Sequence, residues 1–442
     1  MPAADPAAVT APSLPRARAR LVLYTLCGVY VLNFLDRSLL AILAKPIQDT
    51  LHISDGQLGL IGGLYFAVFY CFIAIPIGWL ADQTNRVNVL SVACVIWSAA
   101  TAFCGLASTY PRLVIARMLV GVGEAGGVPP SYALITDYFP PGQRGAAFGI
   151  YNLGPPIGAA LGIAFGAAVA AAFNWRDAFI AIGMVGIVAA VAIRLIVREP
   201  PRGGLDAAPA GLAGSAAATP AAARFWTTVR MFFSRPPLVL AALGSGATQL
   251  VTYGVGNFTT LFLMREKGMT LDEVAVYYAL VVGIAMSAGM LVSGRMLDRF
   301  TRRSKSAYAT LPAASLALAV PFYLGFVWAP SWPLCLLLHV APMFLNYFYL
   351  ASSIALVQEE VRPDQRVMAG ALLLLVMNFI GLGLGPTFVG AASDYFHAAH
   401  PAHSLQLALY SMTPFYVIAI AIFLLLARSL RGESRSSGGT SR

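Results

Sequence analysis

The chain is organised as long apolar runs separated by short polar segments. A helix needs about 20 mainly apolar residues to cross a bilayer, and twelve runs are long enough. They lie at 20–44, 57–80, 87–108, 112–134, 145–172 and 175–197, and then at 236–263, 273–296, 306–328, 333–357, 366–391 and 405–428. This pattern predicts an all-α integral membrane protein with 12 transmembrane helices in two six-helix bundles.

The polar segments divide the 442 residues into five parts. The predicted parts are a disordered cytoplasmic arm at 1–19, an N-terminal bundle at 20–197, a cytoplasmic linker at 198–235, a C-terminal bundle at 236–428 and a cytoplasmic tail at 429–442. The linker is predicted because this stretch is rich in Pro, Gly and Ala and lacks periodic apolar positions until its short amphipathic end.

Composition and charge agree with this topology. Only 11% of the residues are charged and 58% are hydrophobic, whereas soluble domains carry about 25% charged residues. If both termini are cytoplasmic, 22 of the 29 Lys and Arg residues fall on that side and five fall outside, which satisfies the positive-inside rule. We therefore expect a multi-pass protein of the inner (cytoplasmic) membrane. The net charge of +10 reflects topology and attraction to anionic membrane lipids, with no nucleic-acid partner.

The two halves share a motif at matching positions. Gly78-Trp-Leu-Ala-Asp82-Gln-Thr-Asn-Arg86 follows the second span, and Gly294-Arg-Met-Leu-Asp298-Arg299 follows the eighth. A signal repeated at the end of the second helix of each half indicates two duplicated six-helix units.

On these motifs the chain resembles the major facilitator superfamily. The resemblance implies that fold, and a cytoplasmic latch between the halves in which glycine allows close helix approach. The residues assigned to this latch are Gly78, Asp82, Arg86, Asp137, Arg144, Gly294, Asp298 and Arg299. The fifth span contains Gly154-Pro155-Pro156-Ile-Gly158, which is similar to a Gly-Pro motif of exchangers, although Gly and Pro also serve packing and kinking alone.

Two apolar spans carry charges. Asp36 and Arg37 lie in the first span, and Arg117 and Glu124 lie in the fourth. A charge near the bilayer centre costs at least roughly 2.5–3.5 kcal/mol. The rise per residue of a helix places the charges of the first span and those of the fourth at similar depths in the membrane. An acid held partly dry beside an arginine suits proton coupling, and the same two arginines can attract an anionic substrate. The alternative is a permanent ion pair that only fixes helix packing.

The C-terminal half offers uncharged polar groups in its spans. Gln249, Tyr253 and Asn257 recur at four-residue spacing in the seventh span and are predicted to line a substrate cavity. His339 and Asn346 in the tenth span are further substrate candidates, although a packing role for the histidine is the other possibility. The N-terminal half adds four substrate candidates besides Arg117: Asn33, Arg37, Tyr65 and Glu124.

Within the superfamily, the chain resembles the spinster-type lipid transporters. The resemblance rests on Asn33-Phe-Leu-Asp36-Arg37, on Arg117-Met-Leu-Val-Gly-Val-Gly-Glu124-Ala and on Asp137-Tyr-Phe. It implies a proton-coupled transporter that works by alternating access on an amphipathic anionic substrate such as a lysophospholipid or sphingoid phosphate. The anion:cation symporters share several of these residues and would import small carboxylates. A sensor or a lipid scramblase on the same scaffold is a third possibility.

Other chemistry is not expected. No catalytic triad or metal cluster is evident, so we predict no enzyme and no cofactor other than a coupling ion, which is a proton or another cation. The GxGxxG match at Gly121–Gly126 lies inside a membrane helix and follows no strand, which excludes a dinucleotide fingerprint. The expected partners are a small-molecule or lipid substrate and membrane lipids, and the superfamily resemblance implies a monomer.

Overall fold

The protein is a bundle of long helices, as the sequence predicts. A computed structural model describes residues 16–202, 205, 221–362 and 365–438. Twelve helical segments in these ranges are long and apolar enough to cross a membrane, and the described residues contain no strand. The predicted all-α membrane fold is thereby confirmed.

The first half contains six crossings, three of them divided by a short break. Its helices are α1 (Arg16–Ile42), α2 (Ala44–Leu51), α3 (Asp55–Gly62), α4 (Leu64–Gln83), α5 (Arg86–Gly105), α6 (Tyr110–Glu124), α7 (Val128–Tyr138), α8 (Pro141–Tyr151), α9 (Gly154–Ala172) and α10 (Trp175–Ile196). Short breaks divide α3 from α4, α6 from α7, and α8 from α9. A glycine or proline lies at or next to each break, which is the usual cause of interrupted membrane helices.

The second half repeats this plan. Its segments are α12 (Pro236–Arg265), α13 (Leu271–Glu273), the π-helix η1 (Val274–Tyr278), α14 (Ala279–Thr301), α15 (Ala307–Trp328), α16 (Trp332–Leu345), α17 (Phe348–Glu360), α18 (Arg366–Asn378), the π-helix η3 (Phe379–Leu384), α19 (Gly385–His397), the 3₁₀ turn η4 (Pro401–His403), α20 (Ser404–Tyr410) and α21 (Thr413–Gly438).

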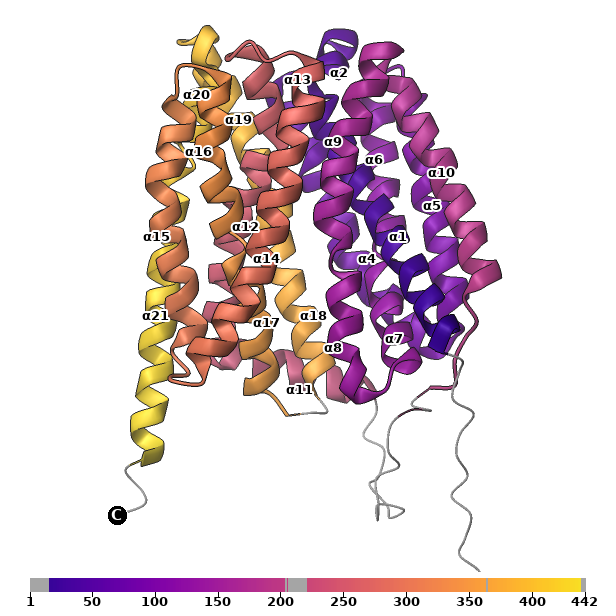
Figure 1. The fold of residues 1–442 in the computed structure, drawn as a ribbon, viewed down its shortest axis with the longest axis vertical. Helices are drawn as coiled ribbons and strands as arrows, with labels where there is room; N and C mark the ends of the chain where they lie inside the picture. Colours follow the sequence, from indigo (N-terminus) through magenta and orange to yellow (C-terminus); the bar gives the residue numbers. More distant parts are fainter. Residues whose placement is uncertain (1–15, 203–204, 206–220, 363–364, 439–442) are drawn as a thin grey trace, which may run out of the picture.

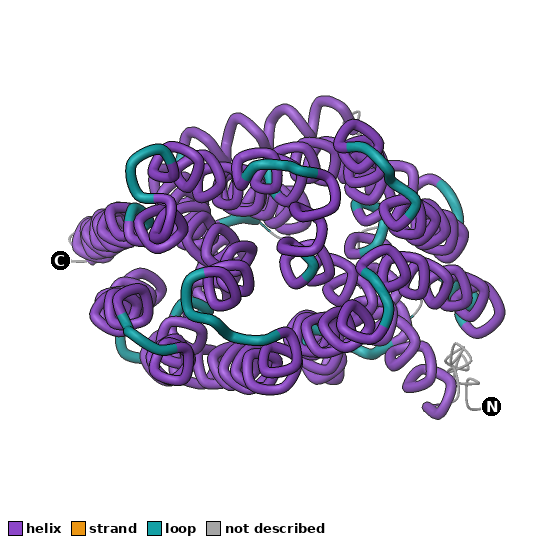
Figure 2. The backbone as a smooth tube through the Cα atoms, turned by 90° about the horizontal axis from the view of Figure 1, so that it is seen from above, coloured by secondary structure: helices purple, strands orange, loops and turns teal. Residues whose placement is uncertain are grey.

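The two halves stand side by side, and the helices of both run roughly along the same axis. Helices α1–α10 form one bundle and α12–α21 the other (Figure 1), and the view along the axis in Figure 2 shows helices throughout, joined by short loops. A further helix, α11 (Ala221–Ser234), lies at one end of the molecule and precedes the second bundle.

Helices extend into three of the segments that were predicted to lie outside the two bundles. The first helix starts at Arg16, inside the arm predicted for 1–19, because Arg and Ala are good helix formers and extend the apolar run backwards. The predicted linker contains α11, whose amphipathic sequence packs Phe232 into the core. The last helix continues to Gly438, ten residues beyond the predicted end of the second bundle at 428. Residues 1–15, 206–220 and 439–442 lie outside the described residues.

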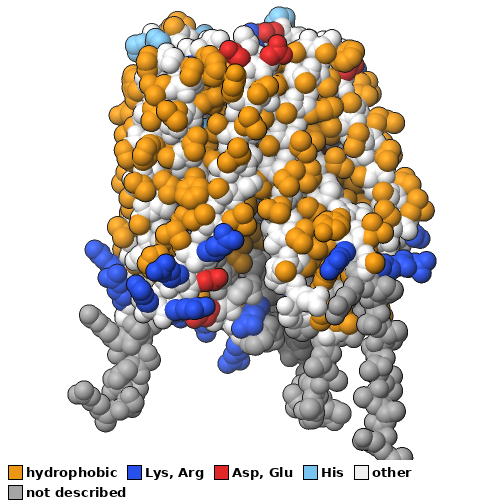
Figure 3. Space-filling view, viewed as in Figure 1, with side chains coloured by type: hydrophobic (Ala, Val, Ile, Leu, Met, Phe, Trp, Pro, Cys, Tyr) orange, Lys and Arg blue, Asp and Glu red, His pale blue; other side chains and the backbone are white. Residues whose placement is uncertain are grey.

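Exposed charged side chains gather at the two ends of the molecule. On the face shown in Figure 3, Lys and Arg gather at the end where α7, α8 and α11 lie, while apolar side chains cover the middle. We call this the basic end; it carries Arg86, Arg202 and Arg299. The opposite end carries Asp55 and Arg265. A wide apolar belt between two charged ends is the expected surface of a membrane-spanning protein.

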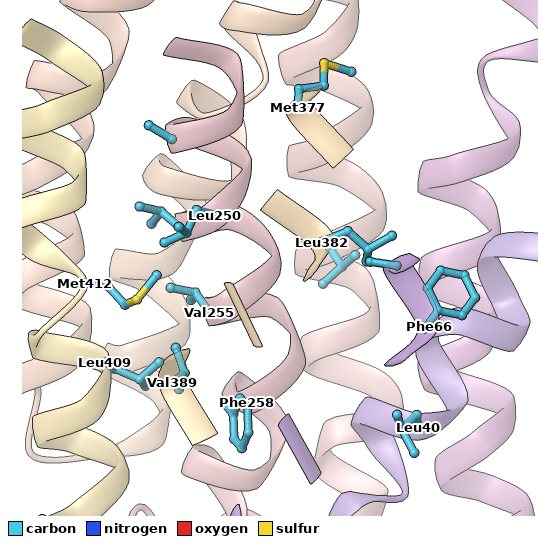
Figure 4. Close-up of a cluster of buried hydrophobic side chains, with 14 of the residues drawn as sticks. Leu40, Phe66, Leu250, Val255, Phe258, Met377, Leu382, Val389, Leu409 and Met412 are labelled. Carbon is cyan, nitrogen blue, oxygen red and sulfur yellow. The ribbon is translucent and has the colours of Figure 1, made fainter. Parts of the chain in front are cut away.

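Apolar side chains from both halves also meet inside the molecule. Figure 4 shows Phe66 of α4 beside Leu382 of η3, and Leu250, Val255 and Phe258 along α12. All five belong to one buried cluster that runs across both halves. The two bundles therefore share an apolar contact in addition to the polar contacts described below.

Glycines bring the charged helices close to their neighbours. A Cβ atom added to Gly158 of α9 would lie 2.3 Å from the carbonyl oxygen of Val31 in α1, so α9 packs directly on the helix that carries Asp36. In α6, a Cβ on Gly121 would lie 2.7 Å from Phe66 O, and one on Gly123 would lie 2.4 Å from Trp97 N. The GxG part of the Gly121–Gly126 sequence thus serves helix packing.

Candidate functional site

A buried ion pair joins the two charged spans. Arg37 Nε of α1 lies 2.6 Å from Glu124 Oε2 at the end of α6, and the glutamate side chain is fully buried while that of the arginine is 12% exposed. The predicted meeting of the first and fourth spans is therefore found in the structure. Taking two charges out of water is costly, and the pair offsets this cost by its attraction and short charge-assisted hydrogen bond.

Asp36 and Arg117 lie beside this pair in a less complete arrangement. Asp36 Oδ2 accepts a hydrogen bond from Thr101 Oγ1 at 2.7 Å, and Arg117 is within electrostatic reach of the carboxylate. Asp36 Oδ1, Glu124 Oε1, and the Nε and Nη1 atoms of Arg117 have no hydrogen-bond partner among the described residues, although each atom is buried. Two acids and two arginines thus lie together with several polar atoms left without partners among the described residues, and we call this group the charge cluster.

Aromatic rings surround the arginines of the charge cluster. The guanidinium carbon of Arg37 lies 5.1, 5.2 and 4.7 Å from the ring centres of Phe34, Phe66 and Tyr70, and that of Arg117 lies 5.3 Å from Phe66. Cation–π attraction over desolvated rings stabilises a buried guanidinium. An apolar wall beside a cation is also a surface that can accept an amphipathic anion.

The two other substrate candidates of the first half make no hydrogen bond to this pair among the described residues. Asn33 lines a small cavity with Tyr30, Trp97 and Tyr151, and its Oδ1 atom is buried without a hydrogen-bond partner among the described residues. Tyr65 is half-buried in α4. The aromatic residues of α4 that contact the arginines are Phe66 and Tyr70 instead.

The three candidates on α12 do not share one position. Tyr253 lies within electrostatic reach of Arg37 and Glu124, so it faces the charge cluster from the other half. Asn257 faces the first half near the opposite end, since a Cβ on Gly62 would lie 2.9 Å from its Oδ1. Gln249 packs against Gly381 of η3, inside the second half. Residues spaced by four point in slightly different directions around a helix of 3.6 residues per turn, so the three side chains face different neighbours.

His339 and Asn346 meet in a separate cavity of the second half. Thr252, Tyr323 and Tyr416 complete its polar lining, and its volume of about 10 Å³ is room for one water molecule. Asn346 Nδ2 donates to Tyr416 Oη at 2.8 Å, but both His339 ring nitrogens and Asn346 Oδ1 are buried without partners among the described residues. The cavity can therefore hydrogen-bond an uncharged polar group or a water molecule.

Three of the predicted latch residues, Arg86, Asp137 and Arg144, make contacts on the side of the first half. Arg86 pairs with Asp137 and with Glu199, each at 2.6 Å. Arg144 Nε donates to the carbonyls of Thr136 and Phe139, where α7 ends.

The glycines of the two repeated motifs are not at crowded crossings. A Cβ on Gly78 or Gly294 would meet nothing within 4 Å, so in this conformation neither serves the close helix approach that the resemblance implies. No hydrogen bond of the Asp82 or Asp298 carboxylates to the other half is seen among the described residues. Asp82 instead accepts from Arg202 of its own half through its backbone carbonyl.

Polar contacts join the halves at the opposite end. Asp55, at the start of α3, accepts from Arg265 Nη1 at 2.8 Å and Nη2 at 2.9 Å, and from Ser393 Oγ at 2.6 Å. Gln48 and Asp394 extend this group: Gln48 Oε1 accepts from Arg265 at 2.8 Å, and Asp394 Oδ2 accepts from the Gly56 amide at 2.9 Å. We call these five residues, Gln48, Asp55, Arg265, Ser393 and Asp394, the interhalf network.

Sequence reasoning did not find the interhalf network. Ser54, Asp55 and Gln57 fit the capping-box pattern of an ordinary helix start, and the capping box is indeed present. Arg265 reads as one of the few basic residues of a non-cytoplasmic loop. The signal that could have found them is an acid and a base at the ends of spans in different halves, on the same side of the membrane, where the two bundles can meet.

No metal centre is apparent in the part of the chain that the structure describes, which contains no group of three or more His, Cys, Asp or Glu residues placed to hold a metal ion.

Comparison with known proteins then identifies the fold. The model of the Major Facilitator Superfamily matches residues 26–314.

The chain belongs to the major facilitator superfamily. Among curated relatives, an "MFS-type efflux pump" of Mycolicibacterium smegmatis is 30% identical over 85% of both chains. A "Hexuronate transporter" of Bacillus subtilis is 26% identical over 82% of this chain and 85% of the relative. "Protein spinster homolog 1" of Rattus norvegicus is 26% identical over 89% of this chain and 76% of the relative.

A solved structure gives the same assignment in three dimensions. It is a bacterial homologue of the human lysosomal transporter spinster in an inward-facing, unoccupied conformation, and it aligns with a TM-score of 0.83 and 30% identity over 95% of this chain and 99% of that one. This chain is therefore a superfamily transporter of the spinster type. The predicted resemblance is confirmed on both counts.

Proposed function

We propose that this transporter couples the movement of an amphipathic anion to the movement of protons by alternating access. The observation that supports this most directly is the charge cluster, in which the Arg37–Glu124 ion pair lies 2.6 Å apart beside Asp36 and Arg117. Its net charge is zero when both acids are ionised. Binding one proton leaves an excess positive charge, which an anionic substrate can neutralise.

The charge cluster can exist with both acids ionised or with one acid protonated, and its arginines have different partners in the two states. With both acids ionised, Arg37 is held by Glu124, and the unpaired donors of Arg117 remain near Asp36. Protonation of either acid weakens its hold on an arginine, and that arginine becomes available to a carboxylate or phosphate. Each substrate anion would then travel with a proton, because an arginine can be satisfied by only one anion at a time, either the ionised acid or the substrate.

The surroundings favour a substrate with an apolar portion. Phe34, Phe66 and Tyr70 line the arginine side of the charge cluster, and the apolar cluster of Figure 4 continues from Phe66 toward the second half. A lysophospholipid or a sphingoid phosphate presents an anionic headgroup and an acyl or alkyl chain that match these two surfaces. The small His339–Asn346 cavity would hydrogen-bond an uncharged part of the ligand or a water molecule.

The orientation follows from charge. We place the basic end and both termini in the cytoplasm of a cell whose inner membrane holds the protein, as the positive-inside rule requires. The interhalf network would then lie outside and close the transporter on that side. Similarity to an inward-facing spinster homologue supports the same assignment.

Flux into proteoliposomes tests this proposal. Purified protein is reconstituted, and uptake of lysophosphatidylglycerol, sphingosine 1-phosphate and glucuronate is measured with and without a pH gradient. We expect the gradient to drive accumulation of one of the two lipids, and Asp36→Asn and Glu124→Gln each to abolish the response to pH. Gradient-driven transport that persists in both variants would refute proton coupling through these acids.

A second candidate substrate class is a small carboxylate, because one relative is a hexuronate transporter. The same assay separates the two classes. If glucuronate is accumulated and neither lipid is transported, the protein is an organic anion symporter. In either case Arg117→Ala should reduce substrate affinity, since Arg117 Nε and Nη1 are buried donors of the charge cluster without a partner among the described residues.

A further inference from the structure

Thr101 is a buried hydroxyl group between Asp36 and the backbone of α5. It is 1% exposed, and its Oγ1 atom lies 2.7 Å from Asp36 Oδ2 and 2.9 Å from the carbonyl oxygen of Trp97. Asp36 Oδ1 has no hydrogen-bond partner among the described residues. Among the described residues, Thr101 thus supplies the hydrogen bond that holds the Asp36 side chain.

A hydroxyl group carries one proton, so Thr101 cannot donate to Asp36 Oδ2 and to the Trp97 carbonyl oxygen at once. When Asp36 is ionised, its carboxylate can only accept, and the threonine must donate to Oδ2. When Asp36 binds a proton, its own O–H group can donate to Oγ1, and the threonine proton turns to the Trp97 carbonyl, as helix threonines commonly do. Rotation about one bond keeps the carboxyl hydrogen-bonded in both states, and Thr101 loses no proton.

The other groups around Asp36 act on it through space. Arg117 and Glu124 of α6, Arg37 of α1 and Cys104 of α5 are its charged or titratable neighbours. No hydrogen bond from any of them to the Asp36 carboxyl is seen among the described residues. On the other side of α1, α9 contains no charged residue, and the charged residues of α10 lie near its ends.

We propose that Thr101 is a positioning residue for proton binding at Asp36, whose hydroxyl donates to the ionised carboxylate and accepts from the protonated one. This inference rests on the proposed function, in which Asp36 carries the coupling proton. A hydrogen bond to an ionised acceptor is roughly twice as strong as one to a neutral group. Thr101 therefore favours proton release, and its loss should let Asp36 keep its proton to higher pH.

Infrared difference spectroscopy on the full chain in liposomes tests this without a substrate. The carbonyl stretching band of a protonated carboxyl group is followed as pH is raised, and the band lost in Asp36→Asn identifies Asp36. Thr101→Val keeps the shape of the side chain and removes the hydroxyl, whereas Thr101→Ser keeps the hydroxyl. We expect the band midpoint to move up by about one pH unit in Thr101→Val and to stay at the parent value in Thr101→Ser.

The outcomes separate this inference from the proposed function. If Asp36→Asn removes a titrating band but Thr101→Val titrates like the parent, Thr101 has no part in proton binding, and the proposed role of Asp36 stands. If Asp36→Asn removes no titrating band, the proposed function fails at Asp36 and the role of Thr101 fails with it. Far-ultraviolet circular dichroism of each variant checks that the helices are intact, and a midpoint unmoved by Thr101→Val in folded protein overturns the inference.

Discussion

Removing Arg265 should loosen the closed end of the transporter. Its guanidinium makes two hydrogen bonds to Asp55, at 2.8 and 2.9 Å, and one to Gln48 at 2.8 Å, and all three cross from the second half to the first. These contacts exist only while the two halves meet at that end. Arg265→Ala therefore weakens the closed conformation without removing a contact that the open conformation needs.

The size of the effect of Arg265→Ala can be estimated from how exposed the Arg265 and Asp55 side chains are. The Asp55 side chain is 6% exposed and that of Arg265 is 27% exposed, so the pair lies between a surface ion pair, worth about 0–1 kcal/mol, and a buried one, whose loss costs about 3–5 kcal/mol. An intermediate value of about 2 kcal/mol corresponds to a roughly 30-fold change in the ratio of closed to open molecules at this end.

Distance measurements between spin labels read this ratio directly. Labels are placed at exposed Thr109 in the first half and exposed Ala398 in the second, with Cys27, the one free cysteine that is not fully buried, replaced by alanine. We expect Arg265→Ala to add a population with a longer separation. The matched control is Lys45→Gln, which removes an ion pair within α2 and breaks no contact between the halves.

The result that would refute this reasoning is a distance distribution in Arg265→Ala equal to that of the parent. An equal change in Lys45→Gln would refute it as well, because the effect would then come from general loss of charge at this end and not from the interhalf network.

Three further predictions follow from the packing and the charge cluster. Glu124→Gln should lower the free energy of unfolding by about 3–5 kcal/mol, because it leaves Arg37 buried without its ionic partner. The double variant Glu124→Gln/Arg37→Met should melt at a higher temperature than Glu124→Gln, because it leaves no unpaired buried charge at this pair. Gly158→Ala should destabilise the protein by roughly 1–3 kcal/mol, whereas Gly149→Ala in the same crossing should be tolerated because its added Cβ meets nothing within 4 Å; parallel melting curves decide this. Gly78→Ala should leave the melting temperature unchanged but slow transport if α4 packs closely when the basic end closes, and unchanged flux would show that it does not.

The sequence predicts the fold well because each crossing leaves a strong local signal. Twelve apolar runs give twelve membrane-spanning segments, and only the ends are misplaced, as at Arg16 and in α11. Helix ends depend on a few residues of moderate propensity, so an arm of Ala and Arg before an apolar run is easily misassigned.

The site was predictable where charge is costly and hidden where it is ordinary. Asp36, Arg37, Arg117 and Glu124 stand out because lipid disfavours them, and depth along two helices is enough to bring them together. Thr101 has no such signal, since threonine is common in membrane helices and often bonds its own backbone. Tertiary contacts alone distinguish it from the other polar residues of the spans.

The charge cluster is poorly built for a structural role alone. A pair kept for packing gains most when every buried polar atom has a partner, and an apolar substitute of the same volume is often at least as stable. Here Asp36 Oδ1, Glu124 Oε1 and two nitrogens of Arg117 are buried without partners among the described residues, although opposite charges lie within electrostatic reach. Each unpaired group costs about 1–3 kcal/mol or more. Atoms left unpaired beside their counterions are free to bind a proton or an anion, and a transporter that exchanges partners at one site needs that freedom.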